Sequence, residues 1–417
     1  MEFVLQALAS WSFRVLVAAT FLSYLGMYLG TTFLSVGSAL MLVVGAPFLL
    51  VNLKGLIRHP VFKPFMFFLL TVGLSICFAE PYPFLKPFLK LRYFLCLLVS
   101  SLVFTLVPSL RKVFLRASWW IAPVFSILAI LQYLKLFNPL KLFFGTITPV
   151  DATGLLTHHT AFGLSMVFVF HLIVSQVKKS RSRSLRWFLV VSASLCVIAV
   201  VCSLSRGAIV ALVFSVLVVF LSGRSLKAGL MMLGLILLVC TLPLILSAPS
   251  RERLTRLDRT VFKDRLSLLS FGWEEFRKHP LMGHGFARFP FELAKYPQKK
   301  EDTGEHGHSH NVYLDLLAGT GVLGFLGFIW IVLVMSKSLL KNLRKCRGSG
   351  ESEEKREWLL GISGVWYAFL AGCLFDEYLL WSQILIPTMT IMGSAFEWPQ
   401  PESLQRMLPW IKRKEME

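Results

Sequence analysis

The chain has 417 residues, of which 55% are hydrophobic and only 16% are charged. Ordinary soluble domains carry about a quarter charged residues, so the composition excludes that class. The net charge of +20 would suggest a nucleic-acid binder if the protein were soluble, but in a membrane chain the position of the basic residues decides their meaning.

Apolar runs long enough to cross a bilayer, roughly 17 to 25 residues each, follow one another along almost the whole chain. We therefore predict an all-α polytopic membrane protein with about twelve transmembrane helices. The predicted helices are 10–30, 33–52, 62–79, 89–108, 114–134, 157–177, 187–204, 207–222, 228–247, 311–335, 358–376 and 381–397. This divides the chain into helices one to nine in 1–247, a large loop in 248–310, helices ten to twelve in 311–397 and a tail in 398–417.

The basic residues are distributed unequally between the two sets of loops. The predicted inner loops and the tail hold 24 Lys and Arg residues, whereas the short outer loops hold six. By the positive-inside rule, both termini are expected in the cytoplasm, and the loop 248–310 on the outer face. The positive charge is thus explained without a nucleic-acid partner.

The loop 248–310 is the first place to look for chemistry, because loops of this length are uncommon unless they are functional. None of the seven cysteines lies in it, so neither a disulfide framework nor a cysteine metal site is predicted. Between Asp264 and about Lys278, apolar residues recur at helical spacing, at Leu266, Leu269, Trp273 and Phe276. This pattern predicts a short interfacial helix that lies with its apolar face on the membrane surface.

Two histidines, His308 and His310, precede the apolar run that begins at Val312. On a helix, residues at i and i+2 point to different sides, so the pair is a poor metal site unless the segment is extended. The positive end of a helix dipole disfavours imidazolium, which keeps a histidine neutral and able to accept a proton. His310 is therefore a candidate general base with His308 behind it. The alternative is two solvated histidines at the membrane interface.

Two arginines are candidates for holding an anion at the outer face. Arg206 lies between two apolar spans, where a desolvated guanidinium needs an anionic partner. That partner is either a phosphate, which suits a planar bidentate donor, or a carboxylate such as Asp376 or Glu377. Arg265 closes an arginine series typical of a surface that binds lipid headgroups, but it falls in the first turn of the predicted interfacial helix and can face inward.

The order and spacing of several short motifs resemble the bacterial O-antigen ligase and polymerase family, over about residues 150–335. The motifs are Thr157-His158-His159-Thr160-Ala161, Ser205-Arg206-Gly207-Ala208, Arg265-Leu266 with Trp273, His279-Pro280-Leu281-Met282-Gly283-His284-Gly285, His308-Ser309-His310-Asn311-Val312-Tyr313-Leu314 and Gly319-Thr320-Gly321-Val322-Leu323-Gly324.

This resemblance implies a glycosyltransferase at the periplasmic face of the inner membrane. Ligase members move a glycan from undecaprenyl diphosphate to a sugar hydroxyl of lipid A–core, and polymerase members move it to another carrier-linked repeat. By motif, Arg206 and Arg265 would bind the diphosphate, and His310 would deprotonate the acceptor, with His308 as the second choice. Candidate substrate contacts are His308, Asn311, His158, His159 and His284, although the pair His158 and His159 also fits a plain membrane-interface position.

No Asp-x-Asp-like pair or metal-ligand cluster is evident on the outer side of the sequence. We therefore expect a reaction without metal or cofactor, and a single displacement that inverts the anomeric centre. The expected partners are the carrier-linked donor, the lipid A–core acceptor and membrane lipids. The twelve-span layout resembles the ligase branch. A polymerase stays open as an alternative, as does a lipid-linked sugar transporter or flippase, which would place more ionisable residues inside the membrane and often show repeated halves.

Overall fold

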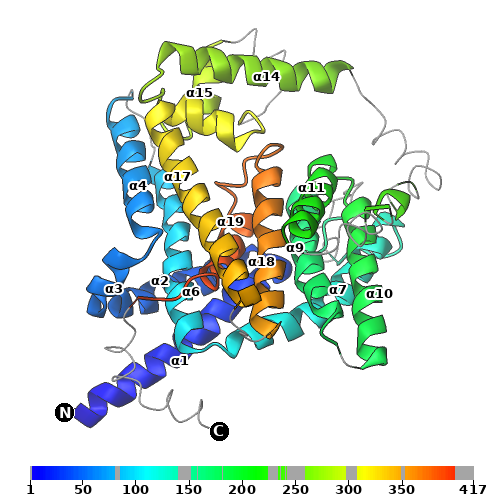
Figure 1. Ribbon diagram of the computed structural model, residues 1–417. Helices are drawn as coiled ribbons and strands as arrows, with labels where there is room; N and C mark the ends of the chain where they lie inside the picture. Colours follow the sequence, from blue (N-terminus) through cyan, green and yellow to red (C-terminus); the bar gives the residue numbers. More distant parts are fainter. Residues whose placement is uncertain are drawn as a thin grey trace.

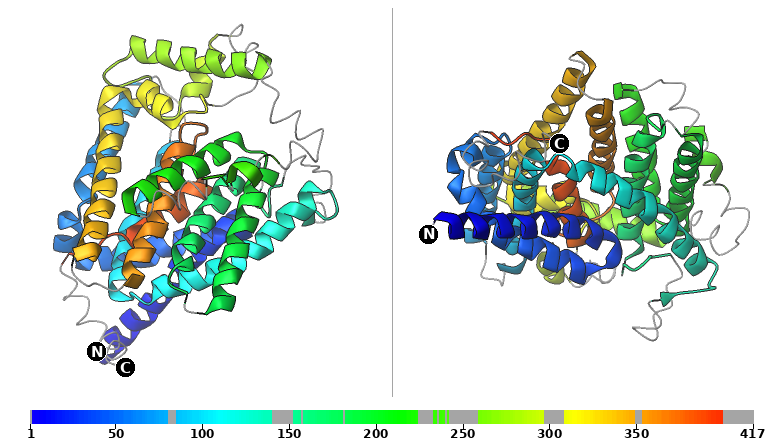
Figure 2. Two further views of the ribbon diagram at one scale, coloured as in Figure 1. Left: turned by 45° about the vertical axis from the view of Figure 1, so that its right-hand side comes forward. Right: turned by 90° about the horizontal axis from the view of Figure 1, so that it is seen from below.

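A computed structural model of the chain describes residues 2–79, 85–139, 152–156, 158–180, 182–223, 233–234, 236–239, 241, 259–296, 308–348 and 353–399. Within these ranges all regular structure is helical. Figure 1 shows that most helices form one bundle and that α14 (Arg259–Lys278) lies across one of its ends. The left view of Figure 2 shows the same arrangement after a turn of the molecule about the vertical axis.

The other helices mostly overlap the predicted apolar runs, although Leu53–Arg58 and Phe289–Ala294 lie in predicted loops. They are α1 (Glu2–Leu29), α2 (Thr31–Val51), α3 (Leu53–Arg58), α4 (Phe62–Cys77), α5 (Leu85–Lys90), the short 3₁₀ helix η1 (Leu91–Phe94), α6 (Leu95–Leu106), α7 (Leu110–Tyr133), α9 (His159–Val177), α10 (Arg183–Cys202), α11 (Arg206–Gly223), α15 (Phe289–Ala294), α17 (Val312–Gly348), α18 (Glu353–Gly372) and α19 (Ser382–Gly393).

Seven stretches of these helices are long and apolar enough to cross a membrane. They are Leu8–Leu29, Thr31–Val51, Phe88–Leu106, Leu110–Tyr133, His159–Val177, Arg183–Cys202 and Val312–Cys346. The helices α4 and α11 contain shorter apolar stretches, and α18 and α19 coincide with the last two predicted spans. The predicted ninth span, 228–247, lies mostly outside the described residues, as does the tail 401–417. The prediction of an all-helical chain with several membrane spans is confirmed, and the number twelve stays a prediction.

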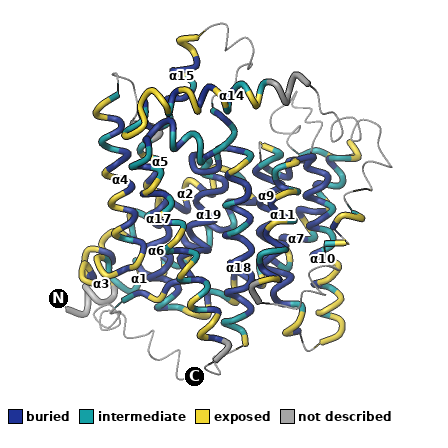
Figure 3. Tube along the Cα trace, turned by 45° about the horizontal axis from the view of Figure 1, so that its top comes forward, coloured by how far each residue is buried: buried dark blue, intermediate teal, exposed yellow. Residues whose placement is uncertain are grey.

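The bundle has two ends, at which its helices begin or end. We call them the histidine end and the basic end, after the side chains found there. At the histidine end, α9 and α17 begin and α18 ends, beneath α14 (Figure 1). At the basic end, α9 ends at Val177, and α7, α10 and α18 begin. Figure 3 shows that buried segments gather in the middle of the bundle, in α6, α9, α18 and α19, whereas outer helices such as α4 and α10 also carry exposed residues. The central helices pack against one another through their apolar residues.

The helix α17 has a sharp break where it contacts the turn that follows α14. Gly321 has φ of 63°, a left-handed conformation that favours glycine. The break lets the N–H of Val322 donate to the carbonyl of Pro280 at 2.9 Å. Gly283, with φ of 69°, lies so close to Gly319 that a side chain there would overlap the backbone. The turn after α14 is thereby seated on the first half of α17.

The helix α14 ends at Lys278 as predicted, but the predicted start at Asp264 is wrong, because the helix begins at Arg259. The stretch before Asp264 contains no glycine or proline that would stop a helix there. A small core of four buried residues joins α14 to α15: Leu268, Phe271, Phe289 and Leu293. Leu266 and Trp273 lie outside this core and are about half exposed, at 49% and 50%, as expected of a helix that rests on a membrane.

Candidate functional site

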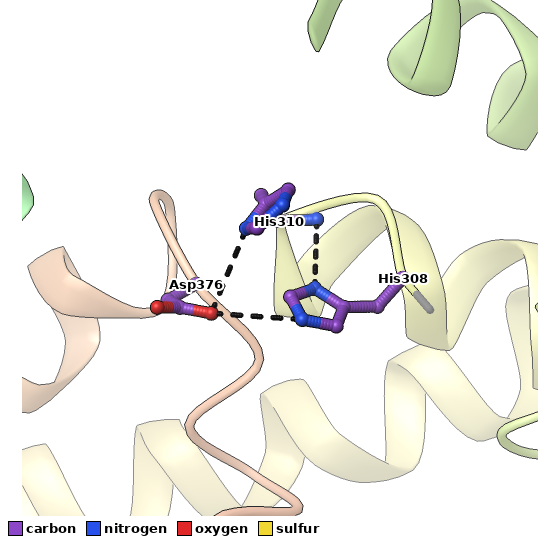
Figure 4. Close-up of side chains that lie close together, drawn as sticks. All are labelled: His308, His310 and Asp376. Atoms are coloured by element: carbon purple, nitrogen blue, oxygen red, sulfur yellow. Dashed lines mark hydrogen bonds and ion pairs between the residues drawn. The ribbon is translucent and has the colours of Figure 1, made fainter. Parts of the chain in front are cut away.

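The centre of the candidate site is a group of three side chains from two segments far apart in the sequence. The Nδ1 atom of His310 lies 3.7 Å from Oδ1 of Asp376, and Nε2 of His308 lies 3.9 Å from the same oxygen. The two imidazole centroids are 4.3 Å apart. Figure 4 shows both rings turned towards the one carboxylate, which stands on the loop between α18 and α19. All three side chains are largely withdrawn from solvent.

The backbone before α17 is not helical, and this brings the two histidines to the same side. His310 has φ of 56°, a left-handed conformation that residues other than glycine rarely adopt. Its N–H donates to Nδ1 of His308 at 3.2 Å. The N–H of Ser309 donates to Oδ1 of Asp315 at 3.1 Å, one turn into α17. We expected the two histidines on different sides only if they lay on a helix at i and i+2. Because this segment is not helical, that expectation does not apply.

Asn311 fixes the start of α17 and the position of the opposite loop. Its side-chain oxygen accepts a hydrogen bond from the N–H of Leu314 at 3.1 Å, which caps the helix. The N–H of Val312 donates to the carbonyl of Cys373 at 2.9 Å, and the Asn311 amide donates to the carbonyl of Leu374 at 3.5 Å. These contacts hold the loop that carries Asp376 against the histidine segment, so Asn311 has a structural task whether or not it contacts substrate.

Asp376 is kept ionised by its neighbours. Burial raises the pKa of this carboxyl, but the facing imidazole of His310, the N–H of Glu377 and the ring of His308 outweigh burial and hold the pKa below its usual value. The N–H of Glu377 donates to Oδ1 at 2.9 Å. An anion on the Nδ1 side of His310 favours the tautomer with the proton on Nδ1. The other ring nitrogen, Nε2, is then the proton acceptor.

The loop 373–381 also faces the start of α11, where Arg206 is the first residue. Gly207 packs so tightly on Phe375 that a methyl group at Gly207 would overlap the Phe375 side chain. The guanidinium of Arg206 is exposed at this end. The structure therefore places Arg206 beside the segment that carries Asp376, while Asp376 itself faces the two histidines.

The histidines that begin α9 lie at the same end. His159 Nδ1 is 3.0 Å from the carbonyl oxygen of Ser203, three residues before Arg206. The ring of His158 lies against Trp381 with centroids 4.8 Å apart. Both side chains are thus positioned by loop contacts around the candidate site, and a role in binding substrate stays a prediction for each.

Arg265 lies on a different helix, α14, which crosses the histidine end of the bundle (Figure 1). It is an exposed residue of α14, and α14 is placed by the close approach of Gly272 to Leu314 near the start of α17. Within the described residues, no contact joins Arg265 to the histidines or Asp376. The predicted pairing of Arg206 with Arg265 on one diphosphate thus needs an anion that spans the space between α11 and α14.

His284 lies below the surface instead of in the open part of the site. Its side chain is 7% exposed, and within the described part of the chain neither ring nitrogen has a hydrogen-bond partner. Burial, with help from the positive charge of Arg288, lowers the pKa of His284 to about 3. The ring lines a cavity of about 20 Å³ with Asp315 and Glu377, room for about one water molecule. His284 is therefore a neutral, buried group beneath the site.

Asp376 is the residue of this group that sequence reasoning did not connect with the histidines. From the sequence we considered it only as one alternative partner for Arg206, and the structure shows it facing the histidines. The sequence signal was its position at the outer start of the short connection between the last two predicted spans. The three side chains also offer ligand atoms within 4.8 Å of one another, a group able to hold a metal ion. A metal-free reaction is accordingly a hypothesis that needs a test.

Comparison with known proteins places most of these residues in one family domain. Residues 191–329 match the family described as O-Antigen ligase. The matched range contains Arg206, Arg265, His284, His308 and His310, and ends in the first half of α17. No curated protein matches the chain. The family resemblance drawn from the motifs is confirmed by this match.

Proposed function

Because residues 191–329 match the O-antigen ligase family, we propose that this membrane protein is a glycosyltransferase of the ligase type. It moves a glycan from undecaprenyl diphosphate to a sugar hydroxyl of lipid A–core. The reaction takes place at the histidine end of the bundle, which faces the periplasm of the inner membrane. Both termini are in the cytoplasm.

The observation that carries this proposal is the orientation of His310 by Asp376. A general base must present a lone pair to the hydroxyl that it deprotonates, and a carboxylate on the opposite ring nitrogen fixes that tautomer. The 3.7 Å between Nδ1 and Oδ1 is longer than a hydrogen bond. The contact is expected to shorten when substrate is bound, as catalytic contacts often do.

The chemical step is a single displacement. The acceptor hydroxyl gives its proton to Nε2 of His310, and its oxygen bonds to the anomeric carbon of the donor glycan. The bond from that carbon to the diphosphate oxygen breaks, and undecaprenyl diphosphate leaves with the electron pair. Attack opposite the leaving group inverts the anomeric configuration.

Arg206 and Arg265 hold the negative charge that grows on the leaving diphosphate. A guanidinium is permanently charged and matches two phosphate oxygens at once. Arg206 stands at the start of α11, where the helix dipole adds partial positive charge. Arg265 approaches from α14, so a diphosphate bound between them would draw α14 towards the bundle.

His308 completes the arrangement from the second side of the carboxylate. Its Nδ1 accepts the N–H of His310, so a neutral ring carries its proton on Nε2, which faces Asp376. We assign His308 to holding the carboxylate and the left-handed backbone at His310, and we assign proton abstraction to His310.

The test is glycan transfer by the purified full chain, with an undecaprenyl-diphosphate-linked glycan as donor and EDTA present. Lipid A–core and a second carrier-linked glycan are offered as acceptors in separate reactions. We expect lipid A–core to be modified and the new linkage to have the opposite anomeric configuration from the donor.

Each other outcome replaces a defined part of the proposal. Growth of the carrier-linked chain alone would make the enzyme a polymerase. Loss of transfer in EDTA that added metal restores would assign His308, His310 and Asp376 to a metal. A product that keeps the donor configuration would exclude a single displacement. Donor binding without transfer to either acceptor would favour a transporter.

A further inference from the structure

The basic end of the bundle contains a large cavity, far from the histidines. It has a volume of about 630 Å³ and lies where α7, α10 and α18 begin and α9 ends. A second cavity of about 260 Å³ adjoins it and shares Lys112, Leu115 and Glu354. The larger volume is in the range of sites that hold small molecules. The glycosyl transfer proposed above uses neither cavity.

Basic side chains outnumber acidic ones around the two cavities. The basic residues in the walls are Arg111, Lys112, Arg116, Lys179 and Lys355, and the acidic ones are Glu353 and Glu354. Glu354 lies between two lysines, 3.5 Å from Lys112 and 3.0 Å from Lys179. Lys112 comes from α7 and Lys179 from the residues after α9, so the two lysines converge on one point in the larger cavity. This arrangement suits a second anion with more charge or more oxygen atoms than one carboxylate.

The floor of the larger cavity adds neutral hydrogen-bonding groups. Gln176 and Ser180 are each 7% exposed and come from the end of α9 and the residues after it. The amide of Gln176 and the hydroxyl of Ser180, together with the lysines, form a set that recognises phosphate and glycerol oxygens.

The helices α7 and α10, which line the cavity, also carry exposed apolar residues. On α7, Val113 and Trp120 are 44% and 70% exposed, and on α10 Trp187 is 61% exposed. Trp120 and Phe188 bring α7 and α10 together, with ring centroids 6.2 Å apart. Tryptophans next to basic residues mark the level of lipid headgroups at a membrane surface. A ligand in this cavity thus has acyl-chain surroundings directly beside it.

From these features we infer that the cavity between α7, α9, α10 and α18 binds the headgroup of an anionic phospholipid. The phosphate binds to Lys112 and Lys179 beside the carboxylate of Glu354, which opposes the binding, and the acyl chains lie along the exposed faces of α7 and α10. Basic pockets between membrane helices bind anionic headgroups for the same electrostatic reason. The site is at the opposite end from the glycosyl transfer, so it holds a lipid of the other leaflet.

Lipid binding is measured by native mass spectrometry of the full chain in detergent, titrated with phosphatidylglycerol and, separately, with phosphatidylcholine. We expect phosphatidylglycerol to be retained preferentially. The double variant Lys112→Gln with Lys179→Gln is expected to weaken its binding by about fivefold for each charge removed. Glu354→Gln is expected to strengthen it, because the two lysines lose their carboxylate.

The matched control is Lys54→Gln with Lys63→Gln, two exposed residues of α3 and α4, which should leave binding unchanged. If the double variant does not fold, Arg116→Gln is used instead, since Arg116 is exposed and lines the cavity without an ion pair in the described part of the chain. Equal retention of both lipids, unchanged binding in the variants, or full competition by millimolar inorganic phosphate would each overturn the lipid site.

Discussion

The two ends of the bundle handle charge in opposite ways. At the histidine end, one ionised carboxylate, Asp376, is buried between two imidazoles. At the basic end, the carboxylate of Glu354 lies between two lysines that are 56% and 37% exposed. Charges that remain near water and have flexible partners contribute little to stability and suit reversible binding of ions. A buried carboxylate with oriented rings suits proton transfer, because it fixes tautomer and position.

This difference separates the two tasks that we assign to the chain. Substitutions at the histidine end should change the rate of glycan transfer, and equivalent substitutions at the basic end should not. The chain offers close counterparts at the two ends, so each variant below has its control at the other end wherever possible.

After the general base, His310, the largest effect is expected for Arg206, the first residue of α11. Arg206→Ala removes a charge that stabilises the leaving diphosphate, and transfer should fall by about 10² to 10³ fold, as when one transition-state donor is lost. Arg206→Lys should recover part of the rate. The control is Arg183→Ala, the first residue of α10 at the basic end, which should transfer at the rate of the wild type. Equal losses in both alanine variants would remove the distinction between the ends.

Asp376→Asn should reduce transfer by about tenfold to a hundredfold, because the neutral amide no longer selects the tautomer of His310. Donor binding should be unchanged, so the effect should appear in kcat and not in KM. Glu353→Gln, at the other end of α18 from Asp376, is the control. A fully active Asp376→Asn enzyme would show that the carboxylate does not orient the base.

His284 links the site to the pH dependence of stability. The pKa of His284 is lowered to about 3 in the fold. Between about pH 3 and pH 6.5, the His284 side chain therefore binds more protons in the unfolded chain than in the folded protein. Stability from this group is therefore complete above about pH 6.5 and decreases as the pH falls, by at most about 1.4 kcal/mol per pH unit. Thermal unfolding in detergent at pH 7, 6 and 5 should show a smaller decrease for His284→Gln. The exposed His279→Gln should behave as the wild type.

The smallest effect compares two asparagines that cap helices. Asn311 accepts the N–H of Leu314 at the histidine end, and Asn52 accepts the N–H of Gly55 at the start of α3. Replacing either by alanine should destabilise the protein by about 1 kcal/mol, the usual value of such a cap. Only Asn311→Ala should also slow transfer, because its cap positions the histidine segment. If both variants transfer equally well, the cap does not support the site.

Local features of the sequence predicted the helices well. Apolar run length and turn residues decide where a membrane helix begins and ends, so the bounds of α2, α4 and α9 lie within a few residues of the predicted ones. The break at Gly321 was not predicted, because its cause is the approach of the turn at Leu281. Gly327, in the same helix, lies close to Phe68 and allows close helix packing instead.

The site was predictable in its histidines and only partly in its geometry. The position of His310 before an apolar span indicated a base, and the family motif supported it. The partnership with Asp376 depends on two hydrogen bonds, from the N–H of Val312 to the carbonyl of Cys373 and from the Asn311 side-chain amide to the carbonyl of Leu374. No local pattern encodes these contacts. The left-handed backbone at His310 was likewise invisible, so the i and i+2 spacing suggested diverging rings where the structure has converging ones.

The most direct test of the assignment is the initial rate of transfer by His310→Ala at saturating donor, with EDTA present and His279→Ala measured beside it. Loss of the general base should lower the rate by about 10² to 10⁴ fold, while His279→Ala, an exposed histidine at the end of α14, should retain the rate of the wild type. A folded His310→Ala protein that transfers glycan at nearly the rate of the wild type would contradict the assignment of the histidine end as the site of reaction.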